Sequence, residues 1–217
     1  MQSLNELRKK KELNIDKQSK IKLIKVRKAV ESDVDGIFNV ASTVGKGKNE
    51  SYGGFLMDDY KKNKEYFKNL FKEKIKELEF FYIAERNKKV IGFLIGYTEE
   101  EWCKDNTNWI GEISWNPDFD LNKTKKFILT DKIAISSNYT GRGVGSKIYK
   151  RLMNDMNKAN YKYIFSETIV YPVANFASLS FMKKQSFELA GTRYEKYKGA
   201  MYFDHIYCKC IEQNQAK

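Results

Sequence analysis

The sequence predicts a single α/β (α+β) domain in which helices flank both faces of a mixed central sheet of about seven strands. A strand pattern, an amphipathic helix pattern and a second strand pattern follow one another over residues 127–171, which predicts a crossover between parallel strands. Two apolar runs at 80–86 and 90–98 are separated by a short polar turn, as in an antiparallel hairpin. The chain has 217 residues, of which 41% are hydrophobic, enough for one sizeable core.

The formal net charge of +12 is high for a chain of this length. Such a charge suits an anionic ligand, a nucleic acid or a negatively charged surface, but lysine-rich solvated faces give the same balance. Nucleic-acid binding is disfavoured because the lysines are spread along the chain, without the aromatic and basic alternation of single-strand platforms. The charge alone does not select a function.

The three cysteines, at positions 103, 208 and 210, lack the spacing of a zinc site, so we expect reduced thiols and no bound metal. The N-terminus has no apolar run typical of a signal peptide, and no apolar stretch approaches the roughly 20 residues needed to cross a bilayer. These features predict a soluble, cytoplasmic protein without a membrane partner.

The first part of the chain divides into a tail, a strand and a helix. Residues 1–20 form a basic N-terminal extension, either a solvated tail or an electrostatic arm toward an acidic partner, and the domain occupies residues 21–217. Alternating apolar residues predict a strand over 21–30. Ser32 is the expected N-cap of a helix that starts near Asp33.

Two irregular segments interrupt the periodic pattern. Residues 43–60 contain four glycines and predict a long loop or a broken helix that could close over a substrate, with Tyr52, Phe55 and Tyr60 as its walls or as core residues. Residues 99–126 predict an insertion between strands and hold all three tryptophans of the chain. These tryptophans form either a substrate wall or a separate packing cluster over a sheet edge.

The remaining elements follow the hydrophobic periodicity. Apolar residues at helical spacing predict three further helices, over residues 66–78, 144–160 and 175–185. Four more strands are expected, over residues 127–136, 163–171, 187–194 and 201–210. The last two strands are joined across Lys198 and Gly199.

A glycine-rich turn leads from the strand at 127–136 into the next helix. Gly141, Gly143 and Gly145 leave the backbone uncovered there, and the start of the helix directs unpaired N–H groups and the positive end of its dipole forward. The expected occupant is a phosphate, although tight turns also use glycine for steric reasons alone. The spacing fits neither a P-loop nor the dinucleotide-binding fingerprint.

Three segments together resemble the GNAT superfamily of N-acetyltransferases, and the resemblance covers roughly residues 21–210. They are the first strand and helix start at 26–33, the glycine loop at 133–147, and the segment at 175–187. The resemblance implies a GNAT-like fold, acetyl-CoA as cosubstrate, and transfer of an acetyl group to a primary amine that attacks directly in a ternary complex. The alternative is an acyl-CoA-binding module with weak or no catalysis. A homodimer is one arrangement that the sequence leaves open.

The resemblance also implies which residues bind acetyl-CoA. Thr140 stands where the family has Gln or Arg, while the two small positions that follow in the family's loop are kept. The backbone of Ile133 and Ile135 would pair with the pantetheine arm, and an N–H there would polarise the thioester carbonyl, an effect typically worth about 3 kcal/mol. Asn175 would contact the cofactor, cap its helix, or do both. The implied cofactor-binding residues are Ile133, Ile135, Thr140, Gly141, Arg142, Gly143, Val144, Gly145, Ser146, Asn175 and Ser178.

The group that protonates the departing thiolate is not evident from the sequence. Met182 stands seven residues after Asn175, where the family often has a tyrosine acid, and methionine has no proton to donate. Tyr171, Tyr139 or water would replace it, or the thiolate would leave unprotonated, as a thiol pKa of about 8.5 allows.

A general base must also take a proton from the attacking ammonium group. Asp131 has the strand parity of Ile133 and Ile135, and Glu167 lies on the neighbouring strand where the two strands should splay apart. Either carboxylate would act directly or through water. The alternative for each is an ion pair with one of the many lysines.

The sequence does not identify the acceptor, and small-molecule and peptide amines both fit. The positive net charge disfavours a strongly cationic acceptor unless the pocket is locally acidic. The acidic runs at 58–59 and 99–101 would supply such local charge, or they are solvated loop residues.

Overall fold

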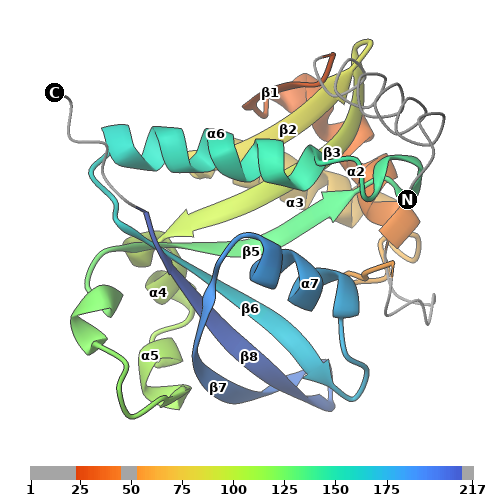
Figure 1. The fold of residues 1–217 in the computed structure, drawn as a ribbon. Coiled ribbons are helices and arrows are strands. Elements are labelled where there is room, and N and C mark those ends of the chain that lie inside the picture. The colour runs from red at the N-terminus through yellow and green to blue at the C-terminus, as the bar shows by residue number, and fades with distance from the viewer. Residues whose placement is uncertain (1–22, 45–52, 212–217) are drawn as a thin grey trace, which may run out of the picture.

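The computed structural model describes residues 23–44 and 53–211. Within these residues the chain forms one eight-stranded sheet with the strand order β1-β2-β3-β5-β6-β8-β7-β4 (Figure 1). The predicted extension at 1–20 and the predicted wall residue Tyr52 lie outside the described residues. The predicted α/β fold with a mixed sheet is confirmed.

The strands lie close to their predicted positions. Their bounds are β1 Lys25–Lys28, β2 Phe80–Arg86, β3 Lys89–Thr98, β4 Ser114–Trp115, β5 Phe127–Ile135, β6 Tyr163–Tyr171, β7 Glu188–Tyr197 and β8 Ala200–Cys210. Only β5 and β6 pair in parallel among the described strands, as the crossover predicted. The sheet has one strand more than expected because β4, within the segment predicted as an insertion, pairs with the outer edge of β7.

Helices cover both faces of this sheet. Their bounds are α2 Val34–Val44, α3 Lys64–Glu77, α4 Glu99–Asp105, α5 Trp109–Glu112, α6 Val144–Lys158 and α7 Phe176–Lys184. Short 3-10 turns occur at Glu31–Asp33, Leu121–Thr124 and Ser137–Tyr139. Figure 1 shows α6 lying across one face of β2 and β3, with α2 and α3 on the other face.

The alternation of side chains along the strands divides the core between the two faces. Phe80 and Tyr82 of β2 are buried in the cluster under α6, whereas Phe81 and Ile83 are buried in the cluster under α2 and α3. Because apolar burial contributes roughly 25 cal/mol per Å², these two layers supply most of the driving force for the fold. They also hold β5, which pairs with β3, between helices on both faces of the sheet.

The segment predicted as an insertion at 99–126 forms an aromatic cluster over the sheet. Trp109 is 1% exposed, and its ring centroid lies 5.4 Å from that of Phe127 and 5.9 Å from that of Phe165. Trp115 stacks on Phe119 at 4.8 Å. For Trp109 and Trp115 the packing alternative is therefore the one observed.

The start of the first helix differs from the expected one. Ser32 lies inside the 3-10 turn, and the capping contact comes from Asp33, whose carboxylate accepts the Val30 N–H at 2.9 Å. The same carboxylate accepts two hydrogen bonds from the Arg27 guanidinium, at 2.6 and 2.8 Å. Burial alone would raise the pKa of Asp33, but these hydrogen bonds and the charge of Arg27 outweigh it, so the pKa lies below its usual 3.8.

We predict that Asp33→Asn lowers the free energy of unfolding at pH 7 by about 1–3 kcal/mol, because a buried charged hydrogen-bond acceptor is lost. The folded-state pKa of Asp33 is depressed, so its contribution is present above about pH 4 and is lost as the pH falls through the folded pKa. Urea unfolding at pH 7 and at pH 3 measures this. The matched control is Asp35→Asn, whose exposed carboxylate pairs with Lys68 and should change stability by less than about 0.5 kcal/mol. Equal losses in the two variants would contradict the assignment.

Candidate active site

A gap opens in the middle of the sheet where β5 and β6 separate. The two strands pair from Phe127 opposite Tyr163 to Thr130 opposite Ser166, and in the described part of the chain their pairing stops there. Beyond this point β5 continues only along β3, and β6 only along β8. The predicted splaying of these two strands is therefore observed.

The backbone of β5 presents hydrogen-bonding groups to this gap. The Ser136 N–H donates to the carbonyl of Ile91 in β3 at 2.9 Å. Backbone groups alternate between the two edges of a strand, so the Ala134 N–H also faces β3, and the N–H groups of Ile133 and Ile135 face the gap. The predicted donors are thus on the open edge.

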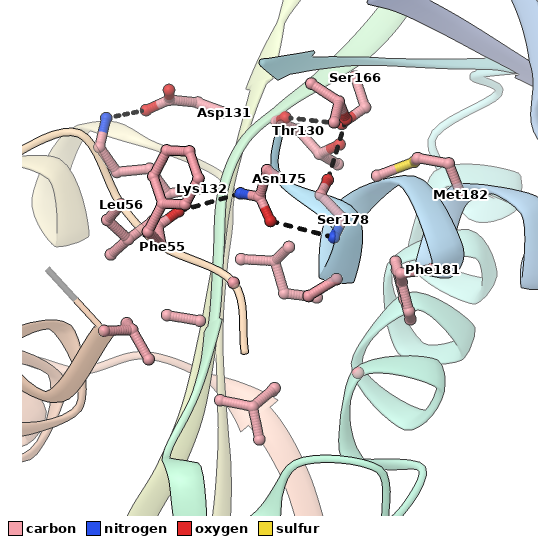
Figure 2. Close-up of a pocket in the computed structure, with 18 of the residues that line it drawn as sticks. Phe55, Leu56, Thr130, Asp131, Lys132, Ser166, Asn175, Ser178, Phe181 and Met182 are labelled. Atoms are coloured by element: carbon pink, nitrogen blue, oxygen red, sulfur yellow. Dashed lines mark hydrogen bonds and ion pairs between the residues drawn. The ribbon is translucent and has the colours of Figure 1, made fainter. Parts of the chain in front are cut away.

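A pocket of about 730 Å³ follows the gap. Its walls come from the end of β5, the start of α6, the start of α7, the middle of β6, and the loop before α3 (Figure 2). Of the predicted cofactor-binding residues, those that line it are Ile133, Ile135, Thr140, Gly141, Gly143, Val144, Gly145, Ser146, Asn175 and Ser178.

The glycine loop forms one end of the pocket. Gly143 is the N-cap of α6 and has a left-handed backbone, with φ of 76°, which favours glycine. A Cβ atom at Gly145 would lie 3.0 Å from the Phe181 ring, so glycine is what allows α6 and α7 to approach each other here. The first N–H groups of a helix have no intrahelical partner, and those of Val144 and Ser146 are at the pocket wall.

Arg142 is the one predicted cofactor residue that lies away from the pocket. The Arg142 guanidinium lies over the ring of Tyr139, 5.7 Å from the centroid, and the Arg142 backbone N–H donates to the Tyr139 carbonyl at 3.4 Å. The left-handed residues on both sides, Gly141 and Gly143, turn its side chain to the surface, where it is exposed. Its side chain therefore does not line the pocket, and a contact between its backbone and the ligand of its neighbours stays a prediction.

Asn175 joins the start of α7 to the loop before α3. Its side-chain oxygen accepts the Ser178 N–H at 3.2 Å, which is the N-cap predicted from the sequence, and its side-chain N–H₂ donates to the Phe55 carbonyl at 3.1 Å (Figure 2). The Ser178 hydroxyl lies 2.9 Å from that of Thr168 on β6. Phe55 is a pocket wall, as predicted, whereas Tyr60 is buried in the core.

Asp131 lies on the pocket wall, but its predicted strand parity is wrong. In the pairing with β3, Ile95 is opposite Lys132 and Gly96 is opposite Thr130, so Asp131 is the extra residue of a β-bulge. The extra residue shifts the alternation of side chains along β5, so the side chains of Asp131 and Ile133 lie on opposite faces of the sheet. Its carboxylate accepts a hydrogen bond from Lys132 at 2.7 Å (Figure 2).

Glu167 also lines the pocket and is held by two donors. The indole N–H of Trp109 and the guanidinium of Arg193 each donate to the same oxygen at 2.8 Å. Tyr171 ends the same strand with 61% of its surface exposed and does not reach the pocket, because β6 runs past the pocket before it ends. Tyr139 and the buried Met182 are both on the pocket wall.

Of the first predicted acidic run, Asp58 lines the pocket and accepts hydrogen bonds from Tyr197 at 2.7 Å and Lys198 at 2.6 Å. Glu195 also lines the pocket and was not predicted. Burial, followed by the charge of Glu167, raises the pKa of Glu195. The turn at Lys198 and Gly199 fixes which residues of β7 and β8 lie opposite each other. From this turn, the sequence could have placed Glu195 opposite Tyr202.

The second acidic run does not reach the pocket. Glu99, Glu100 and Glu101 occupy the first turn of α4, where Thr98 and Glu101 form a capping box with distances of 3.2 and 2.6 Å. Trp102, in the same helix, lines the pocket. Local acidity in the pocket therefore comes from other carboxylates.

The family of the chain follows from a comparison with known proteins. A profile of the Acetyltransferase (GNAT) family matches residues 49–187, which contain the glycine loop, the gap and the start of α7. The chain belongs to this family. Acetyl-CoA is the cosubstrate that the family uses, and membership supports an acyltransferase activity.

Solved GNAT structures share the fold. PaiA N-acetyltransferase from Thermoplasma acidophilum, in complex with coenzyme A, is 17% identical with a TM-score of 0.58, covering 87% of this chain and 99% of that one. YncA from Salmonella typhimurium, with acetyl-CoA, is 13% identical with a TM-score of 0.52 over 89% and 97% of the chains. The ribosomal-protein-S18-alanine N-acetyltransferase from Escherichia coli is 12% identical with a TM-score of 0.56 over 89% and 99%. At these identities the likeness concerns the fold.

Within residues 23–44 and 53–211, no helix is both long enough and apolar enough to cross a bilayer.

We predict that Asn175→Asp keeps the cap of α7 but loosens the loop that contains Phe55. A carboxylate still accepts the Ser178 N–H, whereas it has no hydrogen to donate to the Phe55 carbonyl. Hydrogen exchange of the Leu56 amide, which is bonded to the Val44 carbonyl, should accelerate, while thermal stability should fall less than in Asn175→Ala. Unchanged exchange at Leu56 would show that Asn175 does not hold the loop.

Proposed function

We propose that the protein is an acetyl-CoA-dependent N-acetyltransferase that transfers an acetyl group to a primary amine by direct attack in a ternary complex. The observation that carries this proposal is the gap between β5 and β6. It exposes backbone donors at Ile133 and Ile135 midway between a helix start suited to phosphates and a wall that carries carboxylates. One molecule can therefore extend from an anion site to a proton acceptor.

In this proposal the pyrophosphate of acetyl-CoA lies at the start of α6. The backbone N–H groups of Gly143 to Ser146 and the positive end of the helix dipole favour an anion there. Thr140 has no cationic side chain, so the backbone and the dipole supply the attraction. Asn175 and Ser178 line the opposite wall at the start of α7.

The thioester then lies against β5. An N–H of Ile133 or Ile135 that donates to the thioester carbonyl would also stabilise the negative charge that develops when an amine attacks, and such donors are typically worth about 3 kcal/mol. The pantetheine amides add further hydrogen bonds of the kind made by an added strand.

Two carboxylates from the splayed strands are the proposed proton acceptors. Asp131 directly follows the paired part of β5, Glu167 directly follows that of β6, and both line the pocket. Each is already hydrogen-bonded, Asp131 to Lys132 and Glu167 to Arg193, and a carboxylate has acceptor capacity left for an ammonium group or a bridging water. The attacking amine would pass its proton to one of them.

The departing thiolate needs no acid from Met182. A thiolate with a conjugate pKa of about 8.5 can leave unprotonated, or it takes a proton from water or from the Tyr139 hydroxyl on the pocket wall. The exposed position of Tyr171 argues against that residue.

A second candidate function is acyl-CoA binding without turnover, which the buried methionine at position 182 favours. Isothermal titration with acetyl-CoA, run beside a thiol-release assay on a panel of amines, separates the two. Binding with release of thiol supports the enzyme, and tight binding without release on any amine supports the binding module.

We predict that Gly143→Asp and Gly145→Asp each weaken acetyl-CoA binding at least a hundredfold, because a carboxylate would be placed against the phosphates. Titration calorimetry on the folded variants measures this. Gly199→Asp is the matched control, since Gly199 also has positive φ, of 80°, with no atom near its Cβ position, and it lies outside the pocket. Wild-type affinity in folded Gly143→Asp would rule out this phosphate site.

For the proton acceptor, we predict that Asp131→Asn or Glu167→Gln lowers kcat/KM at least tenfold at pH 6.5 and less at pH 9. A general base contributes most at low pH, where the amine, with a pKa of about 10, is almost entirely protonated. Initial rates across this pH range give the comparison. If both variants keep the wild-type pH profile, neither residue is the base.

A further inference from the structure

One guanidinium is surrounded by carboxylates at the acceptor end of the pocket. Arg193 on β7 is 10% exposed in its side chain and lies 2.8 Å from Glu167, 3.1 Å from Glu112 and 3.5 Å from Glu195. One positive charge thus faces three negative ones. Glu167 and Glu195 line the pocket, so this excess of negative charge can be reached from it.

A fourth carboxyl group belongs to the same group of charges but does not itself line the pocket. Asp204 on β8, the strand between β6 and β7, is directly opposite Arg193 and is 1% exposed. Neither of its oxygens has a hydrogen-bond partner in residues 23–44 and 53–211. Buried polar groups without a partner are rare in folded proteins, because each costs roughly 1–3 kcal/mol in lost hydration. Such a carboxyl would be stabilised by a cation placed beside it.

The charge environment of Asp204 supports this interpretation. Burial, together with the charges of Glu167 and Glu195, raises its pKa to about 8, and Arg193 only partly offsets this. At neutral pH the Asp204 carboxyl is therefore mostly protonated. A cation placed beside it would favour the ionised form.

Two other carboxylates of the pocket wall each pair with a lysine. Asp131 pairs with Lys132 at 2.7 Å, and Asp58 pairs with Lys198 at 2.6 Å. The negative excess is thus confined to the cluster of Glu112, Glu167, Glu195 and Asp204 around Arg193, which we call the acidic cluster. It stands out in a chain whose net charge is +12.

We propose that the acceptor is an aliphatic amine with a second ammonium group, and that the acidic cluster binds this second group while the first amine attacks the thioester. The inference rests on the proposed function and adds the substrate class. Glu195 would contact the second ammonium from the pocket wall, and Asp204 would ionise to balance its charge. Arg193 keeps the carboxylates in place when no substrate is bound.

Three amines of equal chain length test the proposal: 1,4-diaminobutane, butylamine and 4-aminobutanoate. We expect kcat/KM for the diamine to exceed that for butylamine at least tenfold, since hydrogen bonds to charged groups are worth that much or more, and 4-aminobutanoate to be the poorest acceptor. In Glu195→Gln the preference for the diamine over butylamine should fall at least fivefold. Glu188→Gln, an exposed residue of the same strand, should leave it unchanged.

Binding separates a failure of this proposal from a failure of the proposed function. Calorimetry with the full-length protein saturated with coenzyme A should show 1,4-diaminobutane binding at least tenfold more tightly than butylamine. Equal affinities, or equal kcat/KM values, overturn the inference and leave N-acetylation standing. Thiol release on none of the amines overturns the proposed function, and the binding ratio still decides the inference.

The pH dependence of binding tests Asp204 directly. Alkyl ammonium groups stay charged up to about pH 10, so between pH 6.5 and 8.5 the affinity for the diamine should rise about tenfold as Asp204 loses its proton. Asp204→Asn, which imitates the protonated acid, should bind the diamine weakly and without that rise. A wild-type pH dependence in folded Asp204→Asn would contradict the role of Asp204.

Discussion

The separation of β5 from β6 after Thr130 and Ser166 is the constraint on which the rest of the structure depends. Several contacts hold the two strands together up to this point and keep them apart beyond it. The Thr130 hydroxyl donates to the Phe165 carbonyl of β6 at 3.2 Å, and the bulge at Asp131 interrupts the regular course of β5 directly after this contact. On the other strand, Thr168 is bonded to Ser178 of α7. Beyond this point the backbone groups of β5 and β6 that would pair in a closed sheet can instead bind a ligand.

The gap gives each end of the pocket a different chemistry. At one end the start of α6 offers unpaired N–H groups and no acidic side chain in its first turn, which favours an anion. At the other end the acidic cluster favours a cation. An acetyl donor with a pyrophosphate would therefore be attracted to one end of the pocket, and an acceptor with ammonium groups to the other end. The two would meet at the open edge of β5.

The sequence predicted the parts of this arrangement that depend on neighbouring residues. The crossover, the glycine turn and the cap at Asn175 are local, and all three are observed. The bulge that reorients Asp131 depends on how β5 pairs with β3, and the exposure of Tyr171 depends on how far β6 extends past the pocket. Long-range pairing likewise brings Glu167, Arg193 and Asp204 together, so periodicity along one segment could not reveal the acidic cluster.

The proposed reaction depends on hydrogen bonds between acetyl-CoA and the open edge of β5. Backbone amide hydrogen exchange, followed by NMR with and without coenzyme A, tests it at single residues. We expect coenzyme A to slow exchange at Ile133 or Ile135, whose N–H groups face the gap, and to change it little at Ala134, whose N–H faces β3. Equal exchange rates at all three residues with bound coenzyme A would contradict it.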